Sequence, residues 1–204
     1  ASANTTGRPV FWKCLEPGAG VQRVLGKRKA NPVRILLVDH VSKVLGGAEI
    51  NVLELLADPA VRARWQVQVA CAPGSPLAER VGALGWLVLP HQFGEALNEL
   101  RVVGRRFHPL AKVRGWLELR RATRRLRSTV EAHRPEVLLS CTNKDHFAAG
   151  AVGRACGVPS VWWINDILSA DFFGWPVRRV FVHKARRLAA KLTPISDFGR
   201  ETLI

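Results

Sequence analysis

The sequence has no methionine, few acidic residues and no long hydrophobic run, and each of these shortages narrows its interpretation. The aliphatic runs end after a handful of residues, whereas a membrane-spanning helix needs about 20 consecutive apolar residues, so we expect no transmembrane segment. Residues 1–32 contain no apolar stretch followed by a cleavage signature, which argues against a secretory signal. The absence of methionine suggests a fragment or a processed chain.

The four cysteines indicate neither a metal site nor a redox site. Cys14, Cys71, Cys141 and Cys156 are widely spaced and form no C-x-x-C pair, which such sites usually contain. We therefore interpret them as reduced, buried thiols and expect a cytoplasmic location, because thiols stay reduced in that compartment.

The shortage of acidic residues leaves the chain strongly basic. It has 31 lysines and arginines against 16 aspartates and glutamates, which gives a net charge of +15 at pH 7. Such an excess attracts nucleic acid, anionic lipid or a phosphorylated ligand, unless it only reflects arginine bias in a GC-rich genome. The sequence has no zinc-finger spacing, RNP-like aromatic strand or helix-turn-helix pattern, and this disfavours nucleic acid as the partner.

Strand-like and helix-like patterns alternate along residues 33–204, which follow an irregular tail at residues 1–32. The expected strands are residues 35–38, 65–71, 86–89, 137–140, 160–164 and 192–195. The expected helices are residues 48–56, 76–83, 111–133, 143–156 and 177–190. This alternation predicts an α/β fold, namely a Rossmann-like, three-layer domain whose mostly parallel sheet is flanked by helices.

The stretch from residue 34 to residue 56 is the first candidate for a ligand site. Its aliphatic run fits a strand buried on both faces, and a loop with Gly46 and Gly47 then leads into a helix. In open α/β sheets ligands bind beyond the carboxyl ends of the strands, where glycines admit a ligand to the backbone and a helix start favours an anion. The alternative is a simple tight connection between strand and helix. Glu49 is expected to complement the positive helix start.

Three motifs, in this order, resemble those of the N-terminal domain of family 4 glycosyltransferases, which have the GT-B fold. They are GGAE after the first strand, GVPSVWWIND at the fifth strand and PISDF near the end, and the resemblance spans residues 33–204. In that family two Rossmann-like domains face each other across a cleft, and the chain would be one half of such an enzyme. The N-terminal domain mainly holds the acceptor, and the C-terminal domain holds the nucleotide-sugar donor.

The resemblance implies a retaining hexosyltransferase of polysaccharide biosynthesis. Its co-substrate would be a nucleotide-sugar and its acceptor a glycan or a lipid-linked molecule, and it would need neither a metal nor a further cofactor. Gly46 and Gly47 match the loop that approaches the donor's diphosphate and the transferred sugar. Asn165 and Asp166 match the catalytic polar pair at the tip of the fifth strand, where many members carry histidine before the acid. Asparagine can bind a sugar hydroxyl but cannot titrate near neutral pH, so a positioning role is expected for Asn165.

Five residues at the same edge of the predicted sheet are expected to contact the acceptor. They lie in the first loop and just beyond the fourth strand, and are His40, Ser42, Asn143, Lys144 and His146. For His146 an equally good interpretation is a hydrogen-bonded histidine on a helix face. For Asp166 the alternative is a role in capping a helix or in the loop.

The chain ends at Ile204, a few residues into a helix that Ser196 is expected to begin. Ser196 matches the serine at which the next helix of the family starts, so we expect a chain truncated before the C-terminal donor domain and inactive by itself. The competing hypothesis is a non-catalytic Rossmann-like domain whose basic surface binds nucleic acid or an anionic membrane.

The expected helix at residues 111–133 combines an apolar stripe with a basic face. The stripe consists of Trp116, Leu119, Thr123, Leu126 and Val130. The basic residues of the opposite face and its flanks are Arg114, Arg120, Arg121, Arg124 and Arg125. Residues 101–134 contain eleven lysines and arginines but two glutamates, fewer acids than a merely solvated face usually carries. Each cation near an anionic membrane contributes about 1 kcal/mol, so we expect peripheral docking at the inner face of the membrane.

Overall fold

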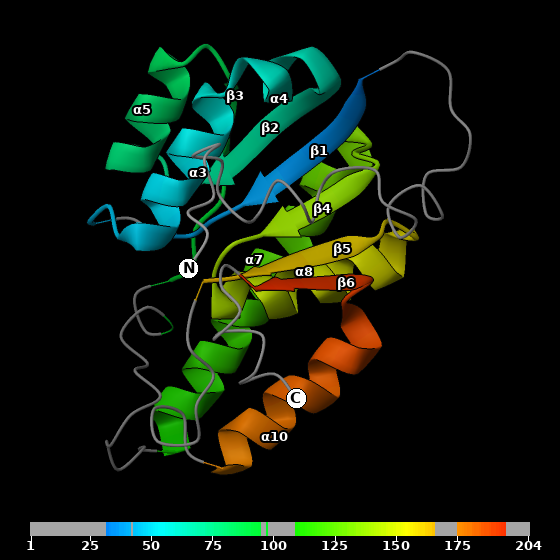
Figure 1. The fold of residues 1–204 in the computed structure, drawn as a ribbon. Helices are drawn as coiled ribbons and strands as arrows, with labels where there is room; N and C mark the ends of the chain where they lie inside the picture. The colour runs from blue at the N-terminus through cyan, green and yellow to red at the C-terminus, as the bar shows by residue number, and fades with distance from the viewer. Residues whose placement is uncertain (1–31, 42, 95–96, 98–108, 166–174, 195–204) are drawn as a thin grey trace, which may run out of the picture.

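The computed structural model describes residues 32–41, 43–94, 97, 109–165 and 175–194 (Figure 1). The strands are β1 (Val33–Val38), β2 (Trp65–Cys71), β3 (Leu87–Pro90), β4 (Val137–Ser140), β5 (Ser160–Ile164) and β6 (Lys191–Pro194). The helices are α3 (Gly47–Ala57), α4 (Pro59–Arg64), α5 (Pro76–Ala83), α7 (Pro109–His133), α8 (Asn143–Cys156) and α10 (Trp175–Leu188). The expected tail at residues 1–31, Ser42, Asp166 and Ser196 lie outside these ranges.

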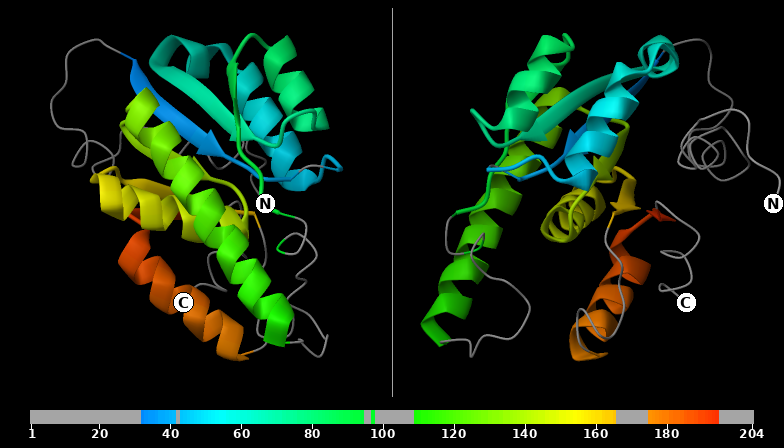
Figure 2. Two further views of the ribbon diagram at one scale, coloured as in Figure 1. Left: turned by 180° about the vertical axis from the view of Figure 1, so that it is seen from behind. Right: turned by 60° about the vertical axis from the view of Figure 1, so that its left-hand side comes forward.

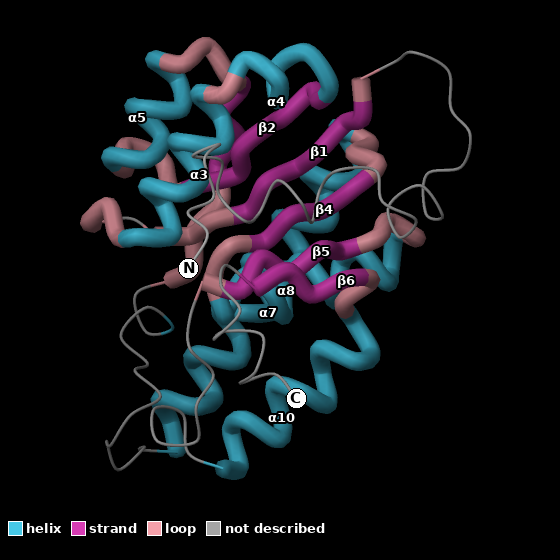
Figure 3. The backbone as a smooth tube through the Cα atoms, in the orientation of Figure 1, coloured by secondary structure: helices cyan, strands magenta, loops and turns pink. Residues whose placement is uncertain are grey.

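The six strands form one parallel sheet, as the alternating pattern predicted. Their order is β3-β2-β1-β4-β5-β6 (Figure 1, and as a tube in the same orientation in Figure 3). β1 is central and pairs with β2 on one side and with β4 on the other. The strand order reverses between β1 and β4, and this reversal is the topological switch point at which doubly wound sheets bind their ligands.

Helices cover both faces of the sheet (Figure 2). Leu37 of β1 packs in a cluster with Val52 and Leu56 of α3, a cluster that also contains residues of α4 and α5. The neighbouring Leu36 packs on the other face, in a cluster with residues of α7 and α8. α10 joins that second layer because its Phe181 packs against Trp162 and beside α8. β1 is therefore buried on both faces, which explains its continuous aliphatic run.

One helix was missed by the sequence pattern, and several ends differ by one or two residues. α4 has six residues, too few to show a helical period, although its start carries two recognisable signals. Asp58 accepts a hydrogen bond from the Ala60 N–H at 2.7 Å, and Pro59 occupies the first turn. The bounds of β2, α5, β4, α8 and β5 were predicted correctly.

The predicted apolar stripe of α7 was wrong at Trp116. This side chain is 54% exposed and lies under the Arg120 guanidinium, 4.5 Å from the ring centroid. The buried face instead begins at Gly115 and continues through Ala122 and Leu126. Small residues occupy two of these buried positions, whereas the pattern had assigned the largest apolar side chain to the inside.

The small residues of α8 also allow close packing, as expected. A Cβ atom added at Gly150 would lie 2.8 Å from the Cβ of Leu188, and one at Gly153 would lie 2.5 Å from the backbone oxygen of Val158. Gly157 ends the helix with a φ of 69°, a left-handed conformation that glycine adopts without strain. α8 therefore depends on glycine for its contact with β5 and for its end.

Gly153→Ala is expected to destabilise the fold by about 1–3 kcal/mol, because a backbone oxygen cannot move away cheaply. The matched control is Gly82→Ala on α5, where an added Cβ meets nothing within 4 Å. Since alanine favours the helix, this control is expected to stabilise by up to about 1 kcal/mol. Denaturant unfolding of both variants measures the difference, and equal stabilities would contradict the close packing of α8.

Candidate functional site

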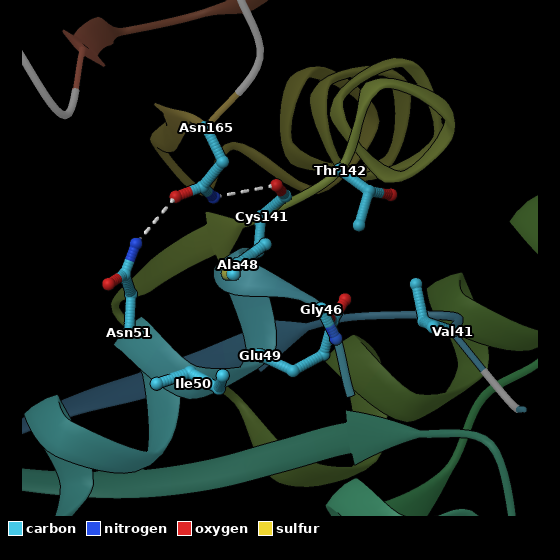
Figure 4. Close-up of a pocket in the computed structure, with 10 residues that line it drawn as sticks. Val41, Gly46, Ala48, Glu49, Ile50, Asn51, Cys141, Thr142 and Asn165 are labelled. Atoms are coloured by element: carbon cyan, nitrogen blue, oxygen red, sulfur yellow. Dashed lines mark hydrogen bonds between the residues drawn. The ribbon is translucent and has the colours of Figure 1, made fainter. Parts of the chain in front are cut away.

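A cavity of about 650 Å³ lies at the carboxyl edge of the sheet, next to the switch point (Figure 4). It is bounded by the segment after β1, the start of α3 and the residues that follow β4 and β5. Its lining residues are Val41, Gly46, Gly47, Ala48, Glu49, Ile50, Asn51, Cys141, Thr142 and Asn165. The structure thus brings together both glycines and Asn165, which the sequence had marked at separate points of the chain.

The glycine loop leads into α3, and the backbone N–H of Gly46 is already hydrogen-bonded. Gly46 is the N-cap, and its N–H donates to the Glu49 carboxylate with a nitrogen–oxygen distance of 2.6 Å. A Cβ at Gly46 would lie 2.8 Å from the same carboxylate oxygen, whereas one at Gly47 would meet nothing within 4 Å. Glu49 is 3% exposed and complements the helix start, as expected. An anion that binds at the glycine loop has to share the start of α3 with this carboxylate.

Asn165 follows β5 and is held in one orientation. Its Nδ2 donates to the backbone oxygen of Cys141 at 2.9 Å and to that of Trp163 at 3.3 Å. Its Oδ1 accepts a long hydrogen bond from the Asn51 Nδ2 at 3.5 Å, which leaves room for a second donor on the same oxygen (Figure 4). Since the amide nitrogen serves the backbone, Asn165 offers an acceptor oxygen to a ligand hydroxyl.

Asp145 is a buried aspartate beside the cavity, in the segment just beyond β4 from which acceptor contacts were expected. Asp145 accepts hydrogen bonds from the backbone N–H of His40 at 2.9 Å and from the Thr142 hydroxyl at 2.7 Å. It also contacts His40 Nδ1 at 2.9 Å and His91 Nε2 at 3.0 Å. Burial acts to raise the pKa of Asp145, but the two histidines hold it well below the ordinary value. The sequence offered one signal for these residues: His40, His91, Thr142 and Asp145 each lie shortly after a strand.

Two neighbours of Asp145 also have shifted pKa values. Burial raises the pKa of Asp39 to about 7, helped by the charge of Asp145 and opposed by the Val41 N–H, which donates to Oδ1 at 2.9 Å. Burial lowers the pKa of His40, but Asp145 outweighs it, and the net shift is upward. Asp39 and His40 therefore both bind protons more strongly in the folded protein than in the unfolded chain.

The predicted acceptor residues beyond β4 have different surroundings. His146 is buried, stacks on Trp162 at 5.1 Å and has Nδ1 2.8 Å from the Ser140 hydroxyl. Burial lowers its pKa to about 3, so it is neutral, and this geometry favours the interpretation as a hydrogen-bonded histidine inside the fold. Lys144 is half-buried and donates to the backbone oxygen of Leu97 at 2.6 Å. Asn143 is half-buried at the start of α8.

The described residues lack two further features. No group of three or more histidine, cysteine, aspartate or glutamate side chains there is arranged to hold a metal ion. In the same part of the chain, every helix is too short or too polar to cross a membrane.

The sequence matches no protein-family model and no curated protein. The fold is similar to that of solved structures. Anabaena Alr3699/HepE in complex with UDP and glucose has a TM-score of 0.61 and 20% identity, over 84% of this chain and 40% of that one. MurG of Acinetobacter baumannii has a TM-score of 0.54 and 12% identity, over 80% of this chain and 41% of that one. A Listeria monocytogenes protein assigned as a UDP-N-acetylglucosamine 2-epimerase has a TM-score of 0.53 and 11% identity, over 85% of this chain and 41% of that one.

At these identities the similarity shows the fold alone. The mostly parallel six-stranded sheet flanked by helices corresponds to one domain of the GT-B glycosyltransferases among these neighbours. The chain spans about 40% of the length of the neighbours it matches.

Asp39→Asn is expected to reduce the loss of stability that accompanies rising pH. Folded Asp39 holds its proton up to about pH 7, against 3.8 for the ordinary carboxyl, so unfolding becomes easier as pH rises through this window. His40 acts in the same direction as pH rises above 6.5, because its folded pKa is raised. The thermal unfolding midpoint is measured for the variant and for the unmodified chain at pH 5 and at pH 8. The midpoint of the variant minus that of the unmodified chain should be several degrees larger at pH 8. An equal midpoint difference at both pH values would rule out a protonated buried Asp39.

Proposed function

We propose that the chain is the N-terminal, acceptor-side half of a retaining glycosyltransferase, which moves a hexose from a nucleotide to a glycan or a lipid-linked acceptor. The observation that carries the proposal is the cavity at the carboxyl ends of β1, β4 and β5, where the glycine loop faces Asn165. A few oriented polar groups in a concave site at a switch point suit a ligand with many hydroxyl groups.

A nucleotide-sugar as co-substrate is supported by the neighbours. HepE, which shares this fold, is known in complexes with UDP and with UDP-glucose. The name of the Listeria protein also refers to a UDP-sugar, although its reaction is an epimerisation. We propose transfer because the GGAE and WWIND segments of this chain resemble those of family 4 glycosyltransferases.

In the proposed reaction two developing charges must be stabilised, the positive charge on the sugar and the negative charge on the leaving diphosphate. The loop of Gly46 and Gly47 serves the diphosphate side, where the phosphate displaces the Glu49 carboxylate from the Gly46 N–H, and the Asn165 Oδ1 accepts a hydrogen bond from the sugar. Asp166, which follows Asn165 outside the described residues, completes the proposed catalytic pair. His40, Ser42, Asn143 and Lys144 are the proposed acceptor contacts. No further cofactor is proposed.

The 204-residue chain alone is expected to transfer no sugar from UDP-glucose. Among the residues known to line the cavity there is no lysine or arginine to hold the leaving diphosphate, and a C-terminal domain would have to supply these cations. In a chain extended by such a domain, Asn165→Ala should lower kcat/KM roughly two- to tenfold, because one hydrogen bond to the ligand is lost. The rate of UDP release measures transfer by the 204-residue chain and by the extended Asn165→Ala variant. Transfer by the 204-residue chain, or an undiminished Asn165→Ala variant, would contradict these roles.

We further propose that α7 and α10 dock this half onto an anionic membrane at the cytoplasmic face. The N-terminal turns of the two helices lie at the same end of the molecule in both views (Figure 2). Trp116 of α7 lies against Arg120, and the exposed Trp175 of α10 has the Arg179 guanidinium 5.1 Å from its ring centroid. Exposed aliphatic side chains accompany them: Val113, Leu117 and Val180. Aliphatic groups enter lipid but do not stack on bases, so this surface favours a membrane over nucleic acid.

Arg121→Glu combined with Arg124→Glu is expected to weaken binding to anionic vesicles by tenfold or more, since each near-surface cation contributes about 1 kcal/mol. Co-sedimentation at low salt with vesicles of phosphatidylcholine alone and with vesicles that also contain the anionic lipid phosphatidylglycerol measures the effect. The matched control reverses two exposed arginines of the opposite layer, Arg64 on α4 and Arg80 on α5. Equal partition of the unmodified chain onto neutral and anionic vesicles would refute membrane docking.

A further inference from the structure

Asp145 connects three segments that are far apart in the sequence. Its partners are His40 in the segment after β1, His91 directly after β3, and Thr142 at the start of α8. β3 and β4 are separated in the sheet by β2 and β1, so the chain that leaves β3 crosses the carboxyl edge to reach Asp145. The ring of Phe93 follows this crossing, with centroids 4.7 Å from His40 and 5.3 Å from His91.

Two of these segments form the wall of the cavity. Val41, which directly follows His40, lines it, and so does Thr142, whose hydroxyl donates to Asp145. The backbone N–H of His40 is itself bound to Asp145, so the bond fixes the course of the main chain as it enters the glycine loop. Asp145 does not line the cavity; it acts through the residues that do.

The buried charge makes this connection stiff. Asp145 is fully buried, and a buried carboxylate is tolerated only while donors occupy its oxygens. If one segment moved away alone, it would leave an uncompensated charge inside the protein. The three segments are therefore expected to keep their relative positions or to give way together.

We propose that Asp145 is a positioning residue, which with His40 and His91 holds the segments after β1, β3 and β4 in the arrangement that shapes the cavity. The expected effect on ligand affinity rests on the proposed sugar-nucleotide function. The expected effect on the positions of the three segments does not. A wall fixed before binding spares the ligand the entropic cost of ordering it.

The experiment compares His91→Leu, His91→Gln and Asp145→Asn in the full chain. His91→Leu removes one donor to Asp145, while the Nε2 of glutamine can take the place of the histidine Nε2 and should restore the bond. The matched control is His183→Leu on the exposed surface of α10. Amide hydrogen exchange is measured at residues 39–47 and, for comparison, at residues 175–194. The affinity for UDP-glucose is measured by calorimetry on the same variants in a chain extended by a donor domain.

His91→Leu and Asp145→Asn are expected to raise exchange at residues 39–47 about tenfold or more, with little change at residues 175–194. His91→Gln should stay close to the unmodified chain, and the affinity for UDP-glucose should fall in the same order as exchange rises. If Asp145→Asn does not fold, the comparison of His91→Leu with His91→Gln tests the proposal by itself. Unchanged exchange at residues 39–47 in His91→Leu, or equal effects of leucine and glutamine, would overturn the proposal. If the unmodified chain extended by a donor domain does not bind UDP-glucose although exchange responds, the ligand assignment fails and the positioning role stands.

Discussion

The burial of β1 at the centre of a parallel sheet is the constraint on which the rest of the structure depends. Leu36, Leu37 and Val38 are fully buried, so the strand needs a helical layer on each face and a strand on each side. After β3 the chain has to return across β2 and β1 to place β4 beside β1, and this return carries α7. The same return creates the switch point at which the cavity lies. One apolar segment of six residues thus determines where polar chemistry can be located.

Much of this fold could be predicted because its signals are local. The bounds of β2, β4 and β5 follow from short apolar runs, and those of α8 from small residues closed by Gly157. The buried face of α7 was predicted at Leu126 and Val130 but not at Trp116, because hydrophobic spacing places the largest apolar side chain inside. Tertiary packing selected Gly115 and Ala122 for the buried face, and left Trp116 on the surface. α4 could not be found by periodicity, since six residues make fewer than two turns.

The site shows the same division between local and long-range information. Gly46, Gly47 and Asn165 were identified because each follows a strand, and the carboxyl ends of parallel strands share one edge. The contact of His91 with Asp145 joins positions 54 residues apart and depends on the strand order, which the sequence pattern did not supply. The burial of His146 depends likewise on Trp162 of a neighbouring strand and Phe181 of α10. Residues that line the cavity were easier to recognise than residues that support its wall.

The Glu49 carboxylate at the start of α3 has a consequence for selectivity. It is tethered three residues from the N–H that it binds, so it competes with any incoming anion at a high effective concentration. Inorganic phosphate has only its own charge and hydrogen bonds with which to displace it. A larger ligand gains additional contacts with Asn51, Thr142 and Asn165 along the cavity. Under the proposed function, the glycine loop is therefore expected to bind a phosphate group that is part of a larger molecule in preference to a small free anion.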